Sequence, residues 1–250
     1  MSQATLFISD LHLDSSRPDI TQLFLSFLAQ EAATADALYI LGDLFEFWIG
    51  DDDTRPDYQP VIQGLRQLTD SGVTAYFMHG NRDFLAGKLF AKQTGCTLLE
   101  DPSVIDLYGE QVLLMHGDTL CTDDTAYQAF RAEVRSARWQ NRILGMSLEE
   151  RIAYFQTLRE ASQESIRKKP AAIMDVNQHT VETLMLDARI TRLIHGHTHR
   201  PGMHNFTLHG KPAMRIVLGD WYTQGSVLVA TANDLRLEKR EVIAGTVPAR

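Results

Sequence analysis

The sequence predicts an α/β protein in which helices and strands pack in layers. Three observations support this fold class. Short apolar runs typical of buried strands alternate with stretches of helical apolar spacing through the first half of the chain. The chain has 250 residues, of which 44% are hydrophobic and 22% charged, so it can bury a continuous core. Polar residues directly follow several of the apolar runs. We expect a single domain over residues 1–250.

The first half of the chain provides four expected strands and two expected helices. The strands are short apolar runs at Thr5–Ser9, Ala37–Leu41, Thr74–Met78 and Gln111–Met115. One helix is expected over residues 20–34, where Ile20, Phe24 and Phe27 recur at helical spacing, and the other near residues 59–70.

Residues 123–169 interrupt this alternation and are expected to form a helical insertion within the domain. They read as two helices, Asp123–Arg142 and Ser147–Lys169, and Ser147 followed by Glu150 is typical of a capped helix start. Residues 131–169 carry nine basic and five acidic residues, although the whole chain has a formal net charge of −8. A solvated helix pair would explain each single charge, but the clustering favours a functional role.

The last third of the chain returns to strands. A helix near residues 171–188 precedes a strand at Arg192–Ile194. Short alternating strands are then expected at 204–209, 213–218, 225–231 and 235–241, with turns at Gly210 and Asn233–Asp234.

The overall charge and the cysteine content exclude several classes of protein. A net charge of −8 argues against a protein that coats nucleic acid. Two cysteines, Cys96 and Cys121, are too few for a disulfide framework and fit a reducing compartment. The N-terminus lacks the pattern of a secretory signal, and no apolar run approaches the roughly 18 residues that span a bilayer. We expect a soluble cytoplasmic protein.

Seven polar residues directly follow five expected strands. They are Asp10, His12, Asp43, Asn81, His116, His197 and His199. Because ligands bind beyond the carboxyl ends of strands in α/β sheets, we expect these side chains to converge on one edge. Carboxylate, amide and imidazole groups suit divalent first-row metals. Seven ligands suffice for two ions if one carboxylate bridges them, an arrangement used for phosphoryl chemistry.

Each of these residues also has a simpler interpretation. A single histidine at a strand end is more often a hydrogen-bonded core residue, and a Gly-Asp pair is usually a turn. Five such strand ends together are hard to assign to chance. His79 and His195 lie within the strand pattern and are interpreted as core or supporting residues, whereas three further histidines are expected at the surface, namely His179, His204 and His209.

The motifs resemble those of the calcineurin-like metallophosphoesterases, in the same order along the chain. These motifs are Asp-x-His, Gly-Asp, Gly-Asn-(His/Arg)-Asp, a separate His and Gly-His-x-His. The resemblance implies a two-layer β-sandwich flanked by helices and a binuclear site bridged by Asp43. It implies that one ion is held by Asp10, His12, Asp43 and His199, and the other by Asp43, Asn81, His116 and His197. Asp83 and Asp118 are expected to support the ligating imidazoles.

Arg82 stands where phosphomonoesterases of this superfamily usually have a histidine that assists the leaving group. Arginine stays protonated, so it can hold phosphoryl oxygens but is a poor proton donor. The substitution suits a leaving group that needs no proton. A pyrophosphate bond fits, because it releases a phosphate monoester whose second pKa is about 6.

Longer stretches resemble the UDP-2,3-diacylglucosamine hydrolases, the pyrophosphatases of lipid A biosynthesis. They include residues 42–53, 79–85, 115–124, 173–178 and 195–201. The resemblance implies hydrolysis to UMP and 2,3-diacylglucosamine 1-phosphate (lipid X) by water attack on the α-phosphorus. It also implies Mn²⁺, two ions per chain, and a peripheral position on the cytoplasmic face of the bacterial inner membrane. The implied catalytic residues are Asp43, Asn81, Arg82 and His116.

The same resemblance implies that the helical insertion at residues 123–169 is a lid that covers the acyl chains of the substrate. Its substrate contacts carry over to Asn81, Arg82, Asp124, Ser162, Ile166, Lys169 and His197. The apolar lid residues have either helix-core or acyl-groove roles, and they are Trp139, Ile143, Leu144, Met146, Leu148, Ile152, Phe155 and Leu158. No nucleic acid and no obligate protein partner are expected.

Two other functions remain open from the residues themselves. One is a nucleotide or cyclic-nucleotide phosphodiesterase on the same scaffold, which the basic, partly apolar insertion and Arg82 disfavour. The other is a metal-free protein-binding scaffold, which the intact set of seven ligand-type residues disfavours. The acidic run Asp51–Asp53 is interpreted as a solvated loop.

Overall fold

The computed structural model describes residues 4–53, 55–169 and 171–242, and within these residues the strands form two sheets. The first sheet has the order β11 (Asp234–Glu241), β10 (Gln224–Thr231), β1 (Thr5–Ile8), β2 (Ala37–Ile40), β3 (Thr74–Met78) and β4 (Thr97–Leu99). The second has the order β5 (Ser103–Leu107), β6 (Glu110–Met115), β7 (Arg192–His195), β9 (Lys211–Val217) and β8 (Gly202–Leu208).

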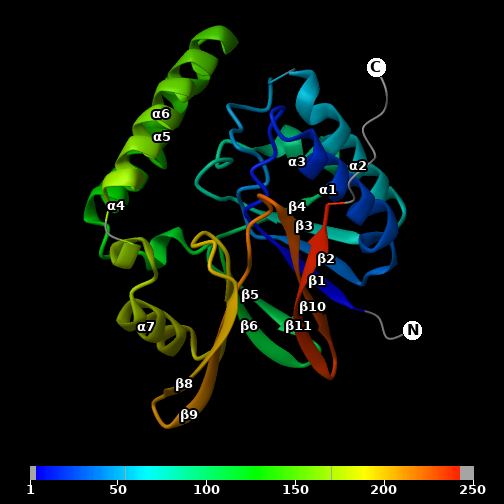
Figure 1. The fold of residues 1–250 in the computed structure, drawn as a ribbon, viewed down its shortest axis with the longest axis vertical. Helices are drawn as coiled ribbons and strands as arrows, with labels where there is room; N and C mark the ends of the chain where they lie inside the picture. Colours follow the sequence, from blue (N-terminus) through cyan, green and yellow to red (C-terminus); the bar gives the residue numbers. More distant parts are fainter. Residues whose placement is uncertain (1–3, 54, 170, 243–250) are drawn as a thin grey trace.

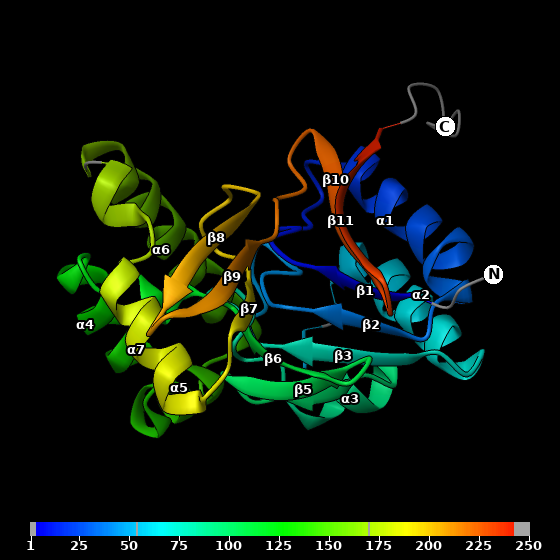
Figure 2. The ribbon, with the colours of Figure 1, turned by 90° about the horizontal axis from the view of Figure 1, so that it is seen from below.

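Helices cover both sheets. They are α1 (Pro18–Gln30), α2 (Gln59–Asp70), α3 (Lys88–Thr94), α4 (Thr125–Val134), α5 (Ala137–Leu144), α6 (Leu148–Lys168) and α7 (Gln178–Ala188). Short 3₁₀ turns lie at Ala32–Thr34, Pro56–Tyr58, Asp118–Leu120 and Ala171–Met174. Helices α1–α3 lie at one end of the molecule and α4–α7 at the other (Figures 1 and 2).

The apolar core is divided by the sheets. Successive residues of β1 point to opposite faces, so Phe7 joins the cluster between the sheets while Leu6 and Ile8 join the cluster under the helices. Tyr39 and Ile194 meet Phe7 in the cluster between the sheets. Strands buried on both faces need continuous apolar runs, which is the pattern that predicted them. The predicted two-layer sandwich flanked by helices is confirmed.

Most predicted elements are found, with several corrections. The four strands of the first half correspond to β1, β2, β3 and β6, and the four strands of the tail to β8–β11. The prediction missed α3, β4 and β5, which have seven, three and five residues. The helix expected over residues 20–34 ends at Gln30, and the helix expected near 171–188 is a 3₁₀ turn followed by α7.

The helix predicted at Asp123–Arg142 is wrong, because it is two helices. Ser136 has an extended backbone, and its hydroxyl accepts a hydrogen bond from the Trp139 backbone N–H at 3.3 Å, which caps a new helix. The predicted cap at Ser147 is confirmed. Its hydroxyl accepts from the Glu150 N–H at 3.3 Å, and the Glu150 carboxylate accepts from the Ser147 N–H at 2.8 Å.

The prediction of a solvated loop at Asp51–Asp53 holds for the exposed Asp52 but is wrong for the other two residues. Asp51 accepts hydrogen bonds from the N–H groups of Gly87 and Leu89 at 2.8 and 2.9 Å, so it holds the start of α3. Asp52 pairs with Arg151 of α6, and Asp53 is buried against Arg55. The contacts of Asp51 and Asp52 join segments that are distant in the sequence, which local composition does not reveal.

Arg151 anchors the helical insertion to the rest of the domain. Its side chain is 2% exposed, and it donates to the Ile49 carbonyl and to Asp52 Oδ1, both at 2.7 Å. Charged hydrogen bonds of this kind contribute about 1.5–3 kcal/mol, so Arg151→Ala is expected to lower the free energy of unfolding by about that amount. Urea denaturation tests this, with Arg236→Ala on β11, 58% exposed, as a control that leaves the midpoint unchanged. An unchanged midpoint in Arg151→Ala would contradict the anchoring role.

No helix in the described ranges is both long enough and apolar enough to cross a membrane.

Candidate metal centre and adjoining cavity

The seven predicted ligand residues lie together, at the carboxyl ends of parallel strands from both sheets. Asp10 and His12 follow β1, Asp43 follows β2, and Asn81 follows β3. From the second sheet, His116 follows β6, and His197 and His199 follow β7. The expected convergence on one sheet edge therefore needs a correction, since the edges of two packed sheets contribute.

One group of ligand-type atoms surrounds His199. Its Nε2 lies 3.3 Å from His12 Nε2 and 3.4 Å from Asp10 Oδ1. His12 Nε2 is also 3.7 Å from Asp43 Oδ2. Asp10 and His12 are buried, and the three residues Asp10, His12 and His199 can bring one ligand atom each to a common point.

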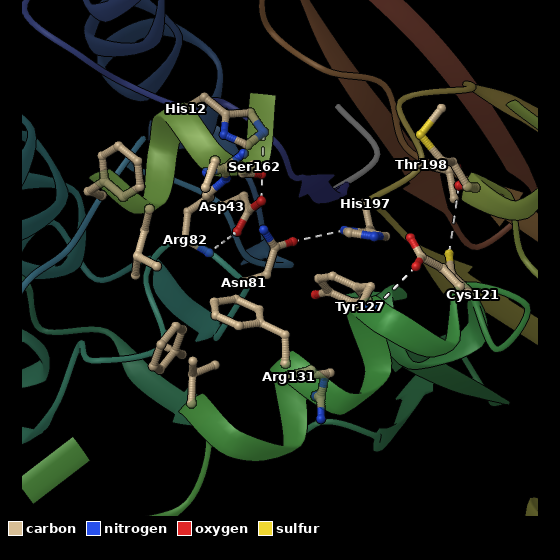
Figure 3. Close-up of a pocket in the computed structure, with 18 of the residues that line it drawn as sticks. His12, Asp43, Asn81, Arg82, Cys121, Tyr127, Arg131, Ser162, His197 and Thr198 are labelled. Atoms are coloured by element: carbon tan, nitrogen blue, oxygen red, sulfur yellow. Dashed lines mark hydrogen bonds and ion pairs between the residues drawn. The ribbon is translucent and has the colours of Figure 1, made fainter. Parts of the chain in front are cut away.

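A second group surrounds Asn81. Its Oδ1 lies 3.1 Å from His116 Nε2 and 2.9 Å from His197 Nδ1. Figure 3 shows the Asn81 amide pointing toward His197 at the floor of the cavity. Asp43 Oδ2 is 3.9 Å from His116 Nε2 and 3.7 Å from His12 Nε2, so one carboxylate oxygen lies between the two groups.

The backbone at these positions is unusual. Asp10, His12, Asp43, His197 and His199 have φ values of 57°, 48°, 54°, 68° and 54°, which is the left-handed region that favours glycine. Such conformations cost free energy and cluster at functional sites. The adjoining glycines permit close approach. A Cβ on Gly80 would lie 2.1 Å from Asp43 Oδ1, and one on Gly196 would lie 2.4 Å from Asp10 Oδ2.

The donor atoms fit a divalent cation. Asp10 Oδ1 is buried and has no hydrogen-bond partner within the described ranges, although a buried carboxylate oxygen normally has one. The His116 Nδ1 lies 2.9 Å from the Leu41 carbonyl oxygen, which assigns a proton to Nδ1 and leaves Nε2 facing the site, where it would coordinate a cation after losing its own proton. Oxygen and imidazole donors with no thiolate are typical of first-row divalent ions.

Charge also shapes the site. Burial by itself lowers the pKa of His116, but the carboxylates of Asp43 and Asp118 outweigh it and raise that pKa to about 9. Burial and the neighbouring His116 lower the pKa of His197 to about 4. The carboxylates therefore favour positive charge at His116, whereas His197 stays neutral.

The expectation that Asp83 and Asp118 support the imidazoles by direct contact is wrong. Asp83 accepts from the backbone N–H groups of Leu44 and Gly80 at 2.7 and 2.8 Å, so it ties the two loops together. Asp118 accepts from Arg131 at 2.6 Å and from the Tyr127 hydroxyl at 2.9 Å.

A cavity of about 610 Å³ opens over this cluster (Figure 3). Its polar lining includes His12, Asp43, Arg82 and His199. Its apolar lining comes mostly from the helical insertion and includes Phe84, Phe130, Val134, Trp139, Phe155 and Leu158. The insertion thus supplies much of the wall that faces the ligand-type residues.

The predicted substrate-contacting residues also line this cavity. Arg82, Asp124, Ser162 and Lys169 all do so, and Lys169 Nζ lies 2.5 Å from Asp124 Oδ2. The Arg82 guanidinium lies over the Phe47 ring at 5.5 Å, and its Nε is buried with no hydrogen-bond partner in the part of the chain that is described. Ile166 belongs to α6, but its side chain is outside those described.

Of the apolar insertion residues, some line the cavity and others do not. Trp139, Phe155 and Leu158 face it. Ile143 is fully buried in the core, whereas Leu144 is 44% exposed. Both expected roles of these residues, helix core and cavity wall, are therefore present.

Tyr222 was missed by the sequence analysis. Its ring stacks on the His12 imidazole with centroids 5.5 Å apart and planes 6° apart, and the Arg17 guanidinium lies 4.8 Å from its centroid. Tyr222 follows β9, which is parallel to β7 and ends at the same edge. The Gly219-Asp220 pair after that strand repeats the pattern that identified the other sites.

The remaining histidines lie outside the cluster. His79 Nε2 lies 2.6 Å from the Ala86 carbonyl oxygen, and His195 is fully buried with its Nε2 3.2 Å from Arg215 Nη1. His179, His204 and His209 are exposed.

Asp101 provides a pH-dependent test of the surroundings. Both of its carboxylate oxygens are buried and lack hydrogen-bond partners among the described residues. Burial and the charge of Asp118 raise the pKa of Asp101 to about 6. Because an unfolded aspartate has a pKa of about 3.9, the folded state binds the extra proton between these values, and stability falls as pH rises from about 4 through 6.

Asp101→Asn should remove this fall in stability with rising pH, and so raise the free energy of unfolding at pH 7 by on the order of 1–3 kcal/mol. Urea denaturation in EDTA at pH 4.5 and pH 7 measures the effect. The exposed Asp106→Asn is the matched control. Parallel pH profiles for Asp101→Asn and the parent chain would contradict the assignment.

Comparisons with known proteins agree with the geometry. The family model of the calcineurin-like phosphoesterases matches residues 4–201. UDP-2,3-diacylglucosamine hydrolases of Escherichia coli, from strain IAI39 and from strain K12 DH10B, are each 53% identical over 234 residues, covering 94% of this chain and 98% of theirs. Among solved structures, an alignment with an archaeal phosphodiesterase covers 95% of this chain and 99% of the phosphodiesterase chain. The two sequences are 10% identical, and the TM-score is 0.47.

Proposed function

The chain belongs to the calcineurin-like phosphoesterase family, a family of metal-dependent enzymes, and from this premise we propose that it hydrolyses UDP-2,3-diacylglucosamine. The products are UMP and 2,3-diacylglucosamine 1-phosphate, and the reaction belongs to lipid A biosynthesis. The observation that carries the proposal is a single cavity lined both by ligand-type residues with Arg82 and by a set of apolar side chains. A substrate with a pyrophosphate and two acyl chains matches both kinds of lining.

We assign the cation ligands in two sets. Asp10, His12, Asp43 and His199 would hold one Mn²⁺, and Asp43, Asn81, His116 and His197 would hold a second. Support comes from the two groups of atoms described above and from the Asp43 oxygen between them. Divalent cations at such a site supply charge stabilisation and a bound water of lowered pKa.

The protein's own groups orient the substrate. Arg82, which faces the cavity beside Asp43, holds phosphoryl oxygens through its fork of N–H donors, and its permanent charge stabilises the negative charge that grows as water attacks the α-phosphorus. Lys169, Asp124 and Ser162 contact the more distant parts of the substrate from the insertion side. The leaving phosphate needs no proton, which is consistent with arginine at position 82.

The apolar side of the cavity accommodates the acyl chains. Phe84, Trp139 and Phe155 form part of this wall. We further propose that exposed basic residues of the insertion, such as Arg138 and Arg142, bind anionic headgroups, so that the enzyme works as a peripheral protein on the cytoplasmic face of the inner membrane.

Hydrolysis of UDP-2,3-diacylglucosamine in ¹⁸O-labelled water tests the proposal. Protein stripped with EDTA is assayed with and without Mn²⁺, beside UDP-glucosamine without acyl chains and bis-p-nitrophenyl phosphate. Mn²⁺-dependent release of UMP carrying ¹⁸O is expected, with little turnover of the sugar that lacks acyl chains. Cleavage of the simple phosphodiester alone would keep a metallophosphoesterase site and overturn the lipid substrate, in favour of a phosphodiesterase of another kind.

A further inference from the structure

We propose that Glu46 is a positioning residue that couples the helical insertion to the metal centre. One of its carboxylate oxygens faces His12, and the other faces Arg159 of α6. This inference rests on the metal centre of the proposed function, and it adds a link by which the position of α6 affects metal affinity.

The first half of the link joins Glu46 to His12. Glu46 Oε2 lies 3.3 Å from His12 Nδ1, and both residues are buried, with exposed fractions of 7% and 3%. His12 Nε2 faces the other ligand-type atoms, 3.3 Å from His199 Nε2. His12 Nδ1 is buried and has no hydrogen bond to any described residue, so the nearby carboxylate is placed to receive its proton after a small rotation.

The backbone holds this pair in register. The His12 N–H donates to the Asp43 carbonyl at 2.9 Å, and the Glu46 N–H donates to the Leu13 carbonyl at 3.0 Å. Leu13 and Phe45 form a parallel bridge between the two loops. Because both loops are paired, the Glu46 side chain has little freedom to leave His12 by backbone motion.

A carboxylate at Nδ1 has a known effect on a metal-binding histidine. It fixes the proton on Nδ1, orients the ring and makes Nε2 a better ligand. Loss of such a partner typically weakens metal binding by about 10–100-fold. Glu46 is therefore expected to matter for metal affinity although it is not assigned as a ligand.

The second half of the link joins Glu46 to the insertion. Arg159 Nε lies 3.5 Å from Glu46 Oε1, and the Arg159 guanidinium lies 5.9 Å from the centroid of the Phe47 ring. The same ring is 5.9 Å from Phe155, one turn earlier on α6, and 5.5 Å from the Arg82 guanidinium. The segment Glu46–Phe47 thus contacts α6 through an ion pair and an aromatic contact together.

The exposure of the two partners indicates what this ion pair does. The Arg159 side chain is 38% exposed, and an ion pair with so exposed a partner contributes little to stability. It can still hold the buried Glu46 carboxylate in one orientation. Movement of α6 away from the body removes this restraint, so docking of the insertion and metal binding favour each other, as thermodynamic linkage requires.

A double-mutant cycle on Mn²⁺ affinity tests the coupling. The dissociation constant of metal-stripped protein is measured from the electron paramagnetic resonance signal of free Mn²⁺. Glu46→Gln should weaken binding by about 10–100-fold. Arg159→Gln should weaken it by a smaller factor, and should have no further effect in the Glu46→Gln background. Equal effects of Arg159→Gln in both backgrounds, or unchanged affinity in Glu46→Gln, would overturn the proposal.

Three further variants distinguish loss of the coupling from a general loss of structure or of positive charge. Arg167→Gln removes the same charge from the same helix two turns away and should leave Mn²⁺ affinity unchanged. Arg159→Lys keeps the charge without the planar fork and should weaken binding less than Arg159→Gln does. If Glu46→Gln fails to fold, as judged by circular dichroism, Glu46→Asp takes its place in the cycle, because its carboxylate is too short to serve both partners.

The cycle is independent of the lipid substrate. If the Mn²⁺ affinities show the expected coupling but UDP-2,3-diacylglucosamine is not cleaved, the coupling stands and the proposed function is overturned. If that substrate is cleaved but the effects of the two substitutions on Mn²⁺ affinity are additive, the proposed function stands and the coupling is overturned.

Discussion

Replacing Asp43 by alanine is expected to abolish hydrolysis, lowering kcat by about 10³-fold or more, because the bound cations supply several kcal/mol of charge stabilisation. Asp43 is 1% exposed, and its Oδ2 lies between His12 and His116. Its Oδ1 accepts from the Arg82 backbone N–H at 2.8 Å, so the variant also loosens the loop that carries Arg82. The measurement is Mn²⁺-dependent release of UMP, together with the metal content of the purified protein.

Asp51→Asn is the matched control for Asp43→Ala. Asp51 is another carboxylate that accepts backbone hydrogen bonds, but these come from the start of α3 and not from the loops that carry the ligand-type residues. It should lower thermal stability while metal content stays at the level of the parent chain. The bridging assignment fails if Asp43→Ala retains both the parental metal content and the parental rate.

Arg82→Ala is expected to lower kcat by about 10²–10³-fold, the usual cost of losing one donor that stabilises transition-state charge. Mn²⁺ affinity should stay within a few-fold of the parent, because the Arg82 side chain is assigned to phosphoryl oxygens and not to the cations. Arg82→Lys keeps the charge but loses the two-pronged geometry, and should recover part of the rate. Steady-state kinetics at saturating Mn²⁺ separates kcat from KM.

A loss of bound Mn²⁺ in Arg82→Ala comparable to that in Asp43→Ala would contradict the assigned role. In that case Arg82 would act by supporting the ligand loops, through the Phe47 ring on which it lies. Recovery by lysine of the metal content, without recovery of kcat, would lead to the same conclusion.

Much of the fold was predictable because its central strands are buried on both faces. Apart from the threonine that begins β1 and β3, the runs at β1, β2 and β3 are apolar, and such runs leave few alternative structures. The edge strand β5 alternates between exposed residues and residues that are at least partly buried, and β4 has three residues, so neither carries a strong local signal. The helix break at Ser136 depends on a single hydroxyl cap.

The ligand-type residues of the site were predictable because they follow strands in a repeated local pattern. Residues that act through distant partners were not. Glu46, Arg151 and Asp51 each contact segments at least 34 positions away, and nothing near them in the sequence indicates the partner. Tyr222 carries the pattern of a residue after a strand, but a tyrosine is not a ligand-type residue and its stacking on His12 appears only in three dimensions.

The spread of the ligand-type residues along the chain has a consequence for protein synthesis. They extend from Asp10 to His199 and come from two sheets, so no fragment that ends before His199 contains a complete centre. While the chain is still being translated, the loops after β1, β2 and β3 exist without the histidines that follow β7. Long-range strand pairing is slow because distant segments must first meet. Under the proposed ligand assignment, hydrolytic activity appears only once β7 has left the ribosome and joined β6, and prematurely terminated chains remain inactive.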